Sequence, residues 1–171
     1  MKHLVLFLEE ASAKAAFEGL LPRFLPEDVT VQYVVFEGKS DMEKQLERKL
    51  RGWIQPNTGF LVLRDQDAAD CHDVKKKLLQ ICQRAGKPGA VVRVACRELE
   101  SWYFGDLAAV ELALGIPNLA AQSRKAKYRE PDAIHAPSSE LKKITKQTYQ
   151  KVAGSREIGK FLSPDSSQNT S

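Results

Sequence analysis

The fold is decided by the stretch Gly59-Phe60-Leu61-Val62-Leu63-Arg64-Asp65-Gln66-Asp67, an apolar run that ends abruptly at charged residues. An apolar run between glycine and charge predicts a strand that is buried on both faces, in the centre of a parallel sheet. Asp65 and Asp67 then follow the carboxyl end of this strand, where open α/β sheets bind their ligands. The sequence therefore predicts a ligand site at this position.

The two aspartates admit two interpretations. Carboxylates held about 4 Å apart repel each other by about 4 kcal/mol at an effective dielectric constant of about 20, and a divalent cation would remove that repulsion. For an isolated Asp-x-Asp the commoner explanation is that the side chains only end the strand and cap the next helix. Residues elsewhere in the chain decide between the two.

Three more strands are expected, at 3–8, 29–36 and 90–95, with amphipathic helical patterns between the strands. Strand and helix thus alternate four times. With right-handed crossovers, this alternation predicts a doubly wound, mainly parallel α/β sheet with helices on both faces.

Acidic residues follow several of these strands. If the strands lie in the order 2-1-3-4, the topological switch point falls between the first and third strands, which places Glu9 beside Asp65 and Asp67. Glu98 and Glu100, beyond the fourth strand, would approach from the neighbouring position. Acidic clusters that are distant in the sequence are therefore expected to converge.

Composition places the chain among ordinary globular proteins. Its 171 residues suffice for one domain, and 43% hydrophobic with 28% charged residues is typical of such domains. No apolar run approaches the roughly 18 residues of a membrane helix, so no membrane contact is expected. Three cysteines without a Cys-x-x-Cys pair argue against disulfides and a zinc site, and they predict reduced thiols in a cytoplasmic protein. The sequence carries no signature of oligomeric state.

Positive charge is concentrated towards the C-terminus. Residues 123–160 contain ten lysines and arginines against four acidic residues, whereas residues 1–122 contain sixteen against seventeen. A basic segment attached to a core with almost no net charge could bind a phosphate-bearing polymer, DNA or RNA. A solvated basic face without a partner is the more frequent explanation. The candidates for phosphate contacts in this segment are Arg124, Lys125, Lys127 and Arg129.

A single domain is expected over residues 1–162, with an α/β core at 1–115 and a basic helical extension at 116–162. Two short helices of the extension are expected to pack on the core through Leu141, Ile144, Val152, Ile158, Phe161 and Leu162. Residues 163–171 contain no hydrophobic side chain, which predicts a disordered tail.

Three motifs resemble the small bacterial Toprim-like proteins, a family named for the topoisomerase–primase domain. They are Leu8-Glu9-Glu10-Ala11-Ser12, Leu61-Val62-Leu63-Arg64-Asp65-Gln66-Asp67 and Arg97-Glu98-Leu99-Glu100-Ser101-Trp102, and the resemblance spans about residues 3–106. In that fold, a glutamate after the first strand and an Asp-x-Asp after the third bind magnesium and carry phosphodiester chemistry. By position, the resemblance assigns these roles to Glu9, Asp65 and Asp67.

The sequence departs from the family pattern at two positions. Glu10 stands where many Toprim proteins have glycine, which leaves open whether Glu9 or Glu10 is functional. Ala69 stands where topoisomerases have a third acid, so the resemblance implies a different metal cage, completed by Glu98 or Glu100. Relatives of this branch occur as nuclease partners of ABC-type or OLD-like ATPases in anti-phage systems, and the resemblance implies such a partner and a role in phage defence.

Magnesium chemistry also fits these residue types by itself. Mg²⁺ prefers about six hard oxygen ligands and keeps several waters, so two or three carboxylates and a substrate phosphate suffice, and Mn²⁺ can substitute. Glu9 is expected to be a ligand or the general acid or base, unless it only stabilises a helix N-terminus. Lys39, Arg64 and Arg97 are candidates to hold a phosphate.

The predicted function is a Mg²⁺-dependent phosphodiester hydrolase, a nuclease that acts on DNA or RNA. The alternative is a non-catalytic, metal-binding regulatory subunit that docks to a partner ATPase. Convergence of Glu9 with the aspartates would favour the first interpretation.

Overall fold

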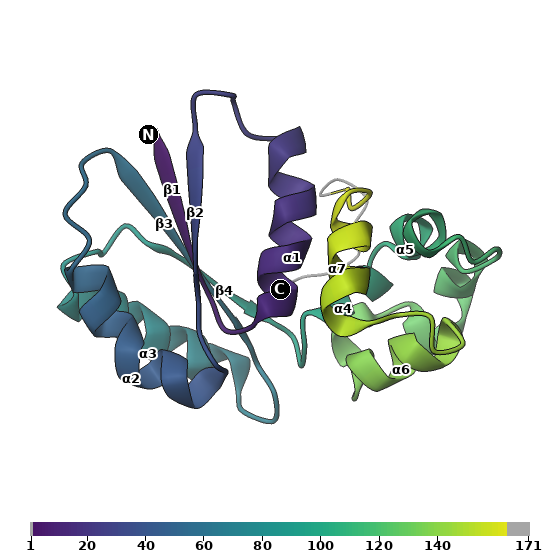
Figure 1. Cartoon of the computed structure of the whole chain (residues 1–171). Coiled ribbons are helices and arrows are strands. Elements are labelled where there is room, and N and C mark those ends of the chain that lie inside the picture. Colours follow the sequence, from purple (N-terminus) through teal and green to yellow (C-terminus); the bar gives the residue numbers. More distant parts are fainter. Residues whose placement is uncertain (1, 164–171) are drawn as a thin grey trace.

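A four-stranded parallel sheet forms the centre of this protein, whose computed structural model describes residues 2–163 (Figure 1). The strands lie in the order β2-β1-β3-β4, and all three pairings are parallel. Their bounds are β1 (His3–Leu8), β2 (Thr30–Val35), β3 (Thr58–Asp65) and β4 (Val91–Ala95). The predicted doubly wound α/β sheet and its strand order are confirmed.

Helices cover both faces of the sheet, as expected. In Figure 1, α2 and α3 lie on one side of the sheet and α1 and α7 on the other, while α4, α5 and α6 gather beyond α7. The helices are α1 (Ala11–Leu20), α2 (Lys39–Arg51), α3 (Cys71–Arg84), α4 (Glu100–Phe104), α5 (Leu107–Leu114), α6 (Pro137–Ile144) and α7 (Lys151–Gly159). Short 3-10 turns lie at Leu21–Arg23, Ala120–Arg124, Ala126–Tyr128 and Pro131–Ala133.

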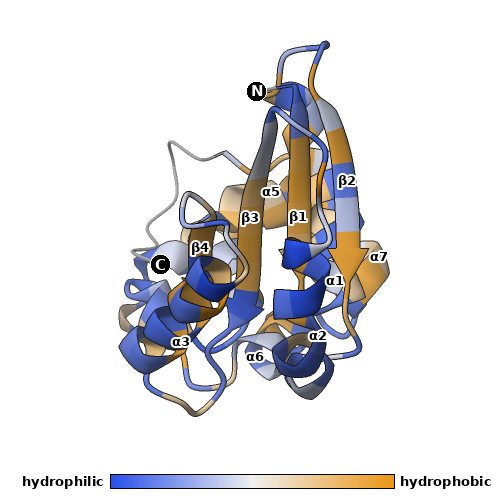
Figure 2. Ribbon diagram, turned by 90° about the vertical axis from the view of Figure 1, so that its left-hand side faces the viewer, coloured by the Kyte–Doolittle hydropathy of each residue, from blue (hydrophilic) through white to orange (hydrophobic). Residues whose placement is uncertain are grey.

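Each face of the sheet has its own hydrophobic core, because successive side chains of a strand point to opposite faces. Val5 and Phe7 of β1 belong to the core beneath α2 and α3. Leu6 and Leu8 belong to the core that includes α1 and the C-terminal helices. Figure 2 shows β1 as hydrophobic along most of its length, whereas β3 becomes hydrophilic at its carboxyl end. The buried sheet therefore ends in charge at that edge.

The helices α1 and α7 approach each other closely at two glycines. A methyl group added at Gly159 would overlap the main-chain carbonyl oxygen of Ala16. One added at Gly19 would lie 2.7 Å from the main-chain nitrogen of Lys160. Because only hydrogen fits at these positions, the two glycines fix α7 against α1.

The C-terminal helices differ from the sequence-based expectation in two side chains. Leu141 and Ile158 are buried as predicted, but Val152 and Phe161 are 44% and 42% exposed, so their predicted packing was wrong. For Val152 the reason is that α7 turns a face made mostly of small residues inward and leaves this side chain outside. Phe161 lies in the turn that follows the end of α7. The buried residues of α7 are Gly154, Ser155, Ile158 and Gly159.

The last described residue continues the fold beyond the predicted boundary at 162. The main-chain N–H of Ser163 donates to Oδ2 of Asp106 over 3.0 Å. Residues 164–171 of the predicted tail lie outside the described residues. Within residues 2–163, no helix combines the length and the apolar character that crossing a bilayer would require.

Candidate active site

The strand register brings Glu9 and Asp65 together. Leu8 of β1 pairs with Leu63 of β3, so the chain leaves both strands at the same edge of the sheet. The main-chain N–H of Asp65 donates to Oε2 of Glu9 over 3.1 Å. Asp65 in turn pairs with Ala95 of β4, which directs the segment after β4 towards the same place. The predicted convergence of Glu9 with Asp65 is therefore present.

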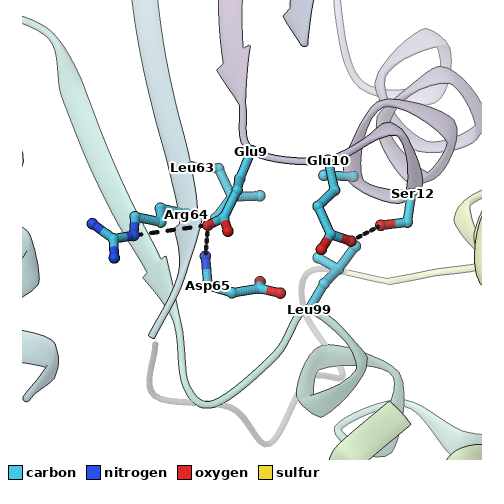
Figure 3. Close-up of a pocket in the computed structure, with 8 residues that line it drawn as sticks. Glu9, Glu10, Ser12, Leu63, Arg64, Asp65 and Leu99 are labelled. Carbon is cyan, nitrogen blue, oxygen red and sulfur yellow. Dashed lines mark hydrogen bonds and ion pairs between the residues drawn. The ribbon is translucent and has the colours of Figure 1, made fainter. Parts of the chain in front are cut away.

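A small cavity lies beside these two residues (Figure 3). Its volume of about 10 Å³ is about the space that one water molecule needs. In Figure 3 the Glu9 carboxylate turns to the main chain of Asp65, while the Asp65 carboxylate turns towards the side of the cavity where Glu10 lies. The lining residues are Glu9, Glu10, Ser12, Ala13, Leu63, Arg64, Asp65 and Leu99.

Glu100 adds a carboxylate that is buried completely, with 0% exposure. Its Oε1 accepts a hydrogen bond of 2.9 Å from the hydroxyl of Tyr149. Burial raises the pKa of Tyr149, so this hydroxyl keeps its proton and acts as the donor. Among the described residues, Oε2 of Glu100 has no hydrogen-bond partner. A buried carboxylate oxygen without a partner is costly, and a cation would offset that cost.

Lys151 places a positive charge among these acids. Its Nζ lies 2.5 Å from Oε2 of Glu10, at the N-terminal end of α7. Burial alone would lower the pKa of Lys151, but the contact with Glu10 and the charges of Glu100 and Asp65 raise it above its ordinary value. Lys151 therefore carries its charge into the cluster formed by Glu9, Glu10, Asp65 and Glu100, which we call the acidic cluster.

The pKa values of three carboxyl groups in the acidic cluster are raised. Burial, followed by the charges of Glu9, Glu100 and Glu10, raises the pKa of Asp65 to about 8. Burial is also the main reason why the pKa values of Glu9 and Glu100 are raised. Carboxylates that repel one another in a buried place either hold protons or bind a cation, and such perturbed groups are typical of functional sites.

Arg64 lies behind the acidic cluster rather than on a substrate-facing surface. It is 4% exposed, its Nε lies 3.8 Å from Oε2 of Glu9, and its Nη1 lies 2.7 Å from Oε1 of Glu43. Glu43 also contacts Nζ of Lys77 at 2.9 Å. The suggested phosphate contact of Arg64 therefore needs correction, because its guanidinium is enclosed and already paired.

Asp67 faces a different neighbour from Asp65. Its Oδ2 lies 3.2 Å from Nζ of Lys39, in an exposed ion pair. Asp67 and Arg97 both have left-handed backbone, with φ of 57° and 62°. The two loops are joined by hydrogen bonds from Asp67 N to Arg97 O at 2.9 Å and from Arg97 N to Oε1 of Gln66 at 3.1 Å. Asp67 is near enough for its charge to raise the pKa of Glu9, but its carboxylate is held by Lys39.

Glu98 has a separate structural partner. Its Oε2 accepts a 2.7 Å hydrogen bond from the main-chain N–H of Ser138, in the first turn of α6. Carboxylates favour such helix N-termini because the first N–H groups there lack partners within the helix. Of the two predicted acids beyond β4, Glu100 therefore reaches the acidic cluster and Glu98 holds α6.

The basic segment at 124–129 forms short 3-10 turns. Nζ of Lys127 lies 2.6 Å from Oε1 of Glu140, and Nε of Arg129 donates to the carbonyl oxygen of Arg124 over 3.2 Å. Nζ of Lys125 donates to Oε1 of Gln122 over 3.5 Å. All four predicted cations stay at the surface, although Lys127 already has an acidic partner.

The residues of the acidic cluster fit magnesium in type and charge. Carboxylate oxygens are hard ligands, and Oε2 of Glu100 is buried without a hydrogen-bond partner among the described residues. The four carboxyl groups of the acidic cluster also exceed the single positive charge of Lys151. Within residues 2–163, no three His, Cys, Asp or Glu side chains are grouped tightly enough to form a ready-made metal cage. Mg²⁺ does not need one, because it usually keeps several waters and binds through one or two carboxylates.

Sequence reasoning missed Lys151 and Tyr149. Neither residue belongs to a motif with metal-ligand or nucleophile spacing. Among the described residues, both lie far beyond the last strand, so strand order could not place them at the site. The one available signal was the excess of positive charge in residues 123–160, which includes Lys151 but does not single it out. Only the packing of α7 on α1 shows that this lysine reaches Glu10.

Comparison with known proteins gives a family and a fold. The family model described as "Domain of unknown function (DUF4276)" matches residues 8–171. No curated protein matches the chain. Among solved structures, the C-terminal region of the Burkholderia pseudomallei OLD protein is similar, with a TM-score of 0.50 and 17% identity, over 95% of this chain and 90% of that one. At this identity the likeness concerns the fold, and it agrees with a Toprim-like arrangement.

Proposed function

We propose that this chain, which belongs to the DUF4276 family, is a Mg²⁺-dependent nuclease. The observation that carries the proposal is the acidic cluster at the carboxyl end of the parallel sheet, where open α/β sheets bind ligands. Glu9, Glu10, Asp65 and Glu100 lie near this edge, Lys151 contacts Glu10, and burial raises the pKa of Glu9, Asp65 and Glu100. A cation and a phosphate together would satisfy this arrangement of charges.

Asp65 and Glu100 are the proposed metal-holding residues. In Figure 3 the Asp65 carboxylate turns away from the Glu9 carboxylate, and Oε2 of Glu100 is buried without a hydrogen-bond partner among the described residues, so each residue has an oxygen that could face a cation. When bound there, Mg²⁺ would neutralise a substrate phosphate and lower the pKa of a coordinated water. The sugar-phosphate backbone of DNA or RNA is the substrate class that this chemistry serves.

Glu9, Lys151 and Lys39 have distinct proposed roles. The Asp65 main chain and Arg64 orient Glu9, whose pKa burial raises above its ordinary value, and Glu9 is the proposed general acid or base. The Lys151 ammonium would contact a phosphate oxygen after leaving Glu10. Lys39 is exposed at the same edge of the sheet and would contact a neighbouring phosphate.

The alternative function is a regulatory subunit for an ATPase, and one observation favours it. Lys151 and Lys39 already neutralise Glu10 and Asp67, so part of the charge is satisfied without a metal. In that case the acidic cluster would only stabilise the fold. The two functions differ in whether the purified chain binds Mn²⁺ and cuts nucleic acid.

Wild-type protein should bind Mn²⁺ and should cleave single- or double-stranded DNA or RNA in Mg²⁺ but not in excess chelator. Mn²⁺ accepts the same oxygen ligands as Mg²⁺, so the binding is measured by electron paramagnetic resonance of free Mn²⁺. Cleavage is followed on labelled DNA and RNA. Mn²⁺ binding without cleavage, with or without an added partner ATPase, would favour the regulatory subunit. Absence of Mn²⁺ binding would refute the metal site.

Binding of nucleic acid should weaken steeply with salt if Arg124, Lys125, Lys127 and Arg129 contact phosphates. Each contact with duplex DNA contributes a log–log slope of about -0.9, because it releases condensed counterions. Replacing all four with glutamine should therefore flatten the slope by roughly three units, since Glu140 already neutralises Lys127. Sequence preference should stay the same, because phosphate contacts carry none.

The salt series is measured by fluorescence anisotropy in Ca²⁺, which suppresses cleavage. The matched control is the double replacement of Lys75 and Lys76, two exposed lysines on α3, with glutamine. This control should keep the wild-type slope. An unchanged slope in the fourfold variant would make the basic segment a solvated face and would direct attention to Lys39 and Arg97.

A further inference from the structure

A buried polar cluster joins α4 to α7 next to the proposed metal site. Tyr149 is 0% exposed, and its hydroxyl lies 2.9 Å from Oε1 of Glu100, 3.1 Å from Oγ of Ser155 and 3.3 Å from the carbonyl oxygen of Lys151. Ser155 and Glu100 are also fully buried. The Tyr149 hydroxyl therefore contacts three residues: the proposed metal ligand Glu100, the main chain of Lys151, and the buried Ser155.

Counting protons assigns the direction of these hydrogen bonds. Oγ of Ser155 lies 2.5 Å from the carbonyl oxygen of Lys151, so the Ser155 proton points to that carbonyl. Tyr149 has a single hydroxyl proton, and its shortest contact is with the carboxylate of Glu100. Tyr149 therefore donates to Glu100.

This hydrogen bond makes the two oxygens of Glu100 unequal. Oε1 is occupied by Tyr149, whereas Oε2 has no partner among the described residues. Gly154 provides the room for this arrangement, because a methyl group at that position would lie 2.5 Å from Cδ2 of the Tyr149 ring. The ring also packs edge-on against Tyr103, with centroids 6.1 Å apart. Tyr149 is thus fixed by packing as well as by hydrogen bonds.

We infer that Tyr149 is a positioning residue of the metal site, which orients Glu100 so that Oε2 is the oxygen presented to the cation. This inference rests on the proposed function. The metal site then depends on a hydroxyl that is not itself a ligand, and this hydroxyl belongs to the segment just before α7. Groups that hold metal ligands in place typically change metal affinity or activity about 10- to 100-fold when they are removed.

Tyr149→Phe tests the inference, because it removes the hydroxyl and keeps the ring. The full-length variant should bind Mn²⁺ about 10- to 100-fold more weakly than wild type, measured with Mn²⁺ alone by electron paramagnetic resonance. The matched control is Tyr128→Phe. Tyr128 is also buried and also donates to a glutamate, Oε1 of Glu140 at 2.6 Å, but Glu140 lies outside the acidic cluster. This control should leave Mn²⁺ affinity unchanged.

Two further measurements separate positioning from a general loss of structure. In a Glu100→Gln background, Tyr149→Phe should have little additional effect on Mn²⁺ affinity, because the two residues act as one unit. Ser155→Ala should weaken Mn²⁺ binding by a smaller factor, because the carbonyl oxygen of Lys151 then competes for the Tyr149 proton. The Ser155 variant also tests the inference if Tyr149→Phe fails to fold.

The outcomes distinguish the two proposals. If wild type binds Mn²⁺ and Tyr149→Phe binds it within twofold of wild type, the positioning role is overturned while the metal site stands. If Tyr149→Phe weakens Mn²⁺ binding by the same factor in the Glu100→Gln background as in wild type, the positioning role is likewise overturned. If wild type binds no Mn²⁺, the proposed function falls and this inference falls with it.

Discussion

Replacing Asp65 with asparagine should lower Mg²⁺-dependent cleavage at least about 100-fold, because even groups that only hold a metal ligand contribute about 10- to 100-fold. The substitution keeps the size of the side chain and removes the negative charge that Asp65 would present to a bound cation. Cleavage is compared with that of Asp28→Asn, an exposed aspartate before the amino end of β2. Wild-type cleavage by Asp65→Asn would locate the activity elsewhere or reveal a contaminant.

The same variant should be more stable than wild type when no metal is present. The pKa of Asp65 is about 8 in the folded protein, against an ordinary value of 3.8, so between these values the folded state holds more protons than the unfolded state. The contribution of Asp65 to wild-type stability therefore falls as the pH rises from about 4 to about 8. The asparagine side chain has no proton to lose, so the free energy of unfolding should rise by on the order of 1 to 4 kcal/mol at pH 7.

Urea unfolding of both proteins at several pH values, in chelator, measures this effect. The gain should shrink as the pH falls towards 4 and should vanish at pH values well below 3.8, where Asp65 is protonated in both states. Addition of Mg²⁺ should stabilise wild type more than the variant. A variant that is less stable than wild type at pH 7 would show that the Asp65 carboxylate is not under electrostatic strain.

Gly159→Ala should destabilise the protein by about 2 to 4 kcal/mol. The added methyl group would overlap the carbonyl oxygen of Ala16, and main-chain atoms of a packed helix cannot move aside as a flexible side chain can. For a chain of this length, the loss corresponds to a fall in Tm of roughly 5 to 15 °C. Thermal unfolding followed by circular dichroism gives the value directly.

Gly89→Ala is the matched control, because a methyl group there would meet no atom within 4 Å. It should change the stability by less than about 0.5 kcal/mol. Equal effects of the two substitutions would mean that α1 and α7 separate easily. In that case the place of Lys151 beside Glu10 would not be fixed by this helix pair.

The sheet and the first half of the site were predictable from local sequence. The apolar run that ends at Arg64 predicted a central strand, and parallel strands that share a register bring Glu9 and Asp65 to one edge. The pattern did not show where the side chains point after the strands end. Asp67 takes a left-handed backbone and pairs with Lys39, and Arg64 turns inwards to Glu43.

The second half of the site depended on packing that leaves no local pattern. Glu98 and Glu100 are two residues apart and looked equivalent, yet one holds α6 and the other is buried in the acidic cluster. The contact of Lys151 with Glu10 joins residues that are far apart in sequence and depends on close contact between two helices. Hydrophobic periodicity identifies a helix, but it does not say which helix lies beside which.

The division of the acidic cluster between the two halves of the chain has a consequence for protein synthesis. Glu9 and Asp65 emerge from the ribosome well before Glu100, and Lys151 emerges last. An incomplete polypeptide that ends before α7 lacks Lys151. If the protein is a nuclease, the cell's own nucleic acids meet a complete site only when synthesis of the described region is nearly finished.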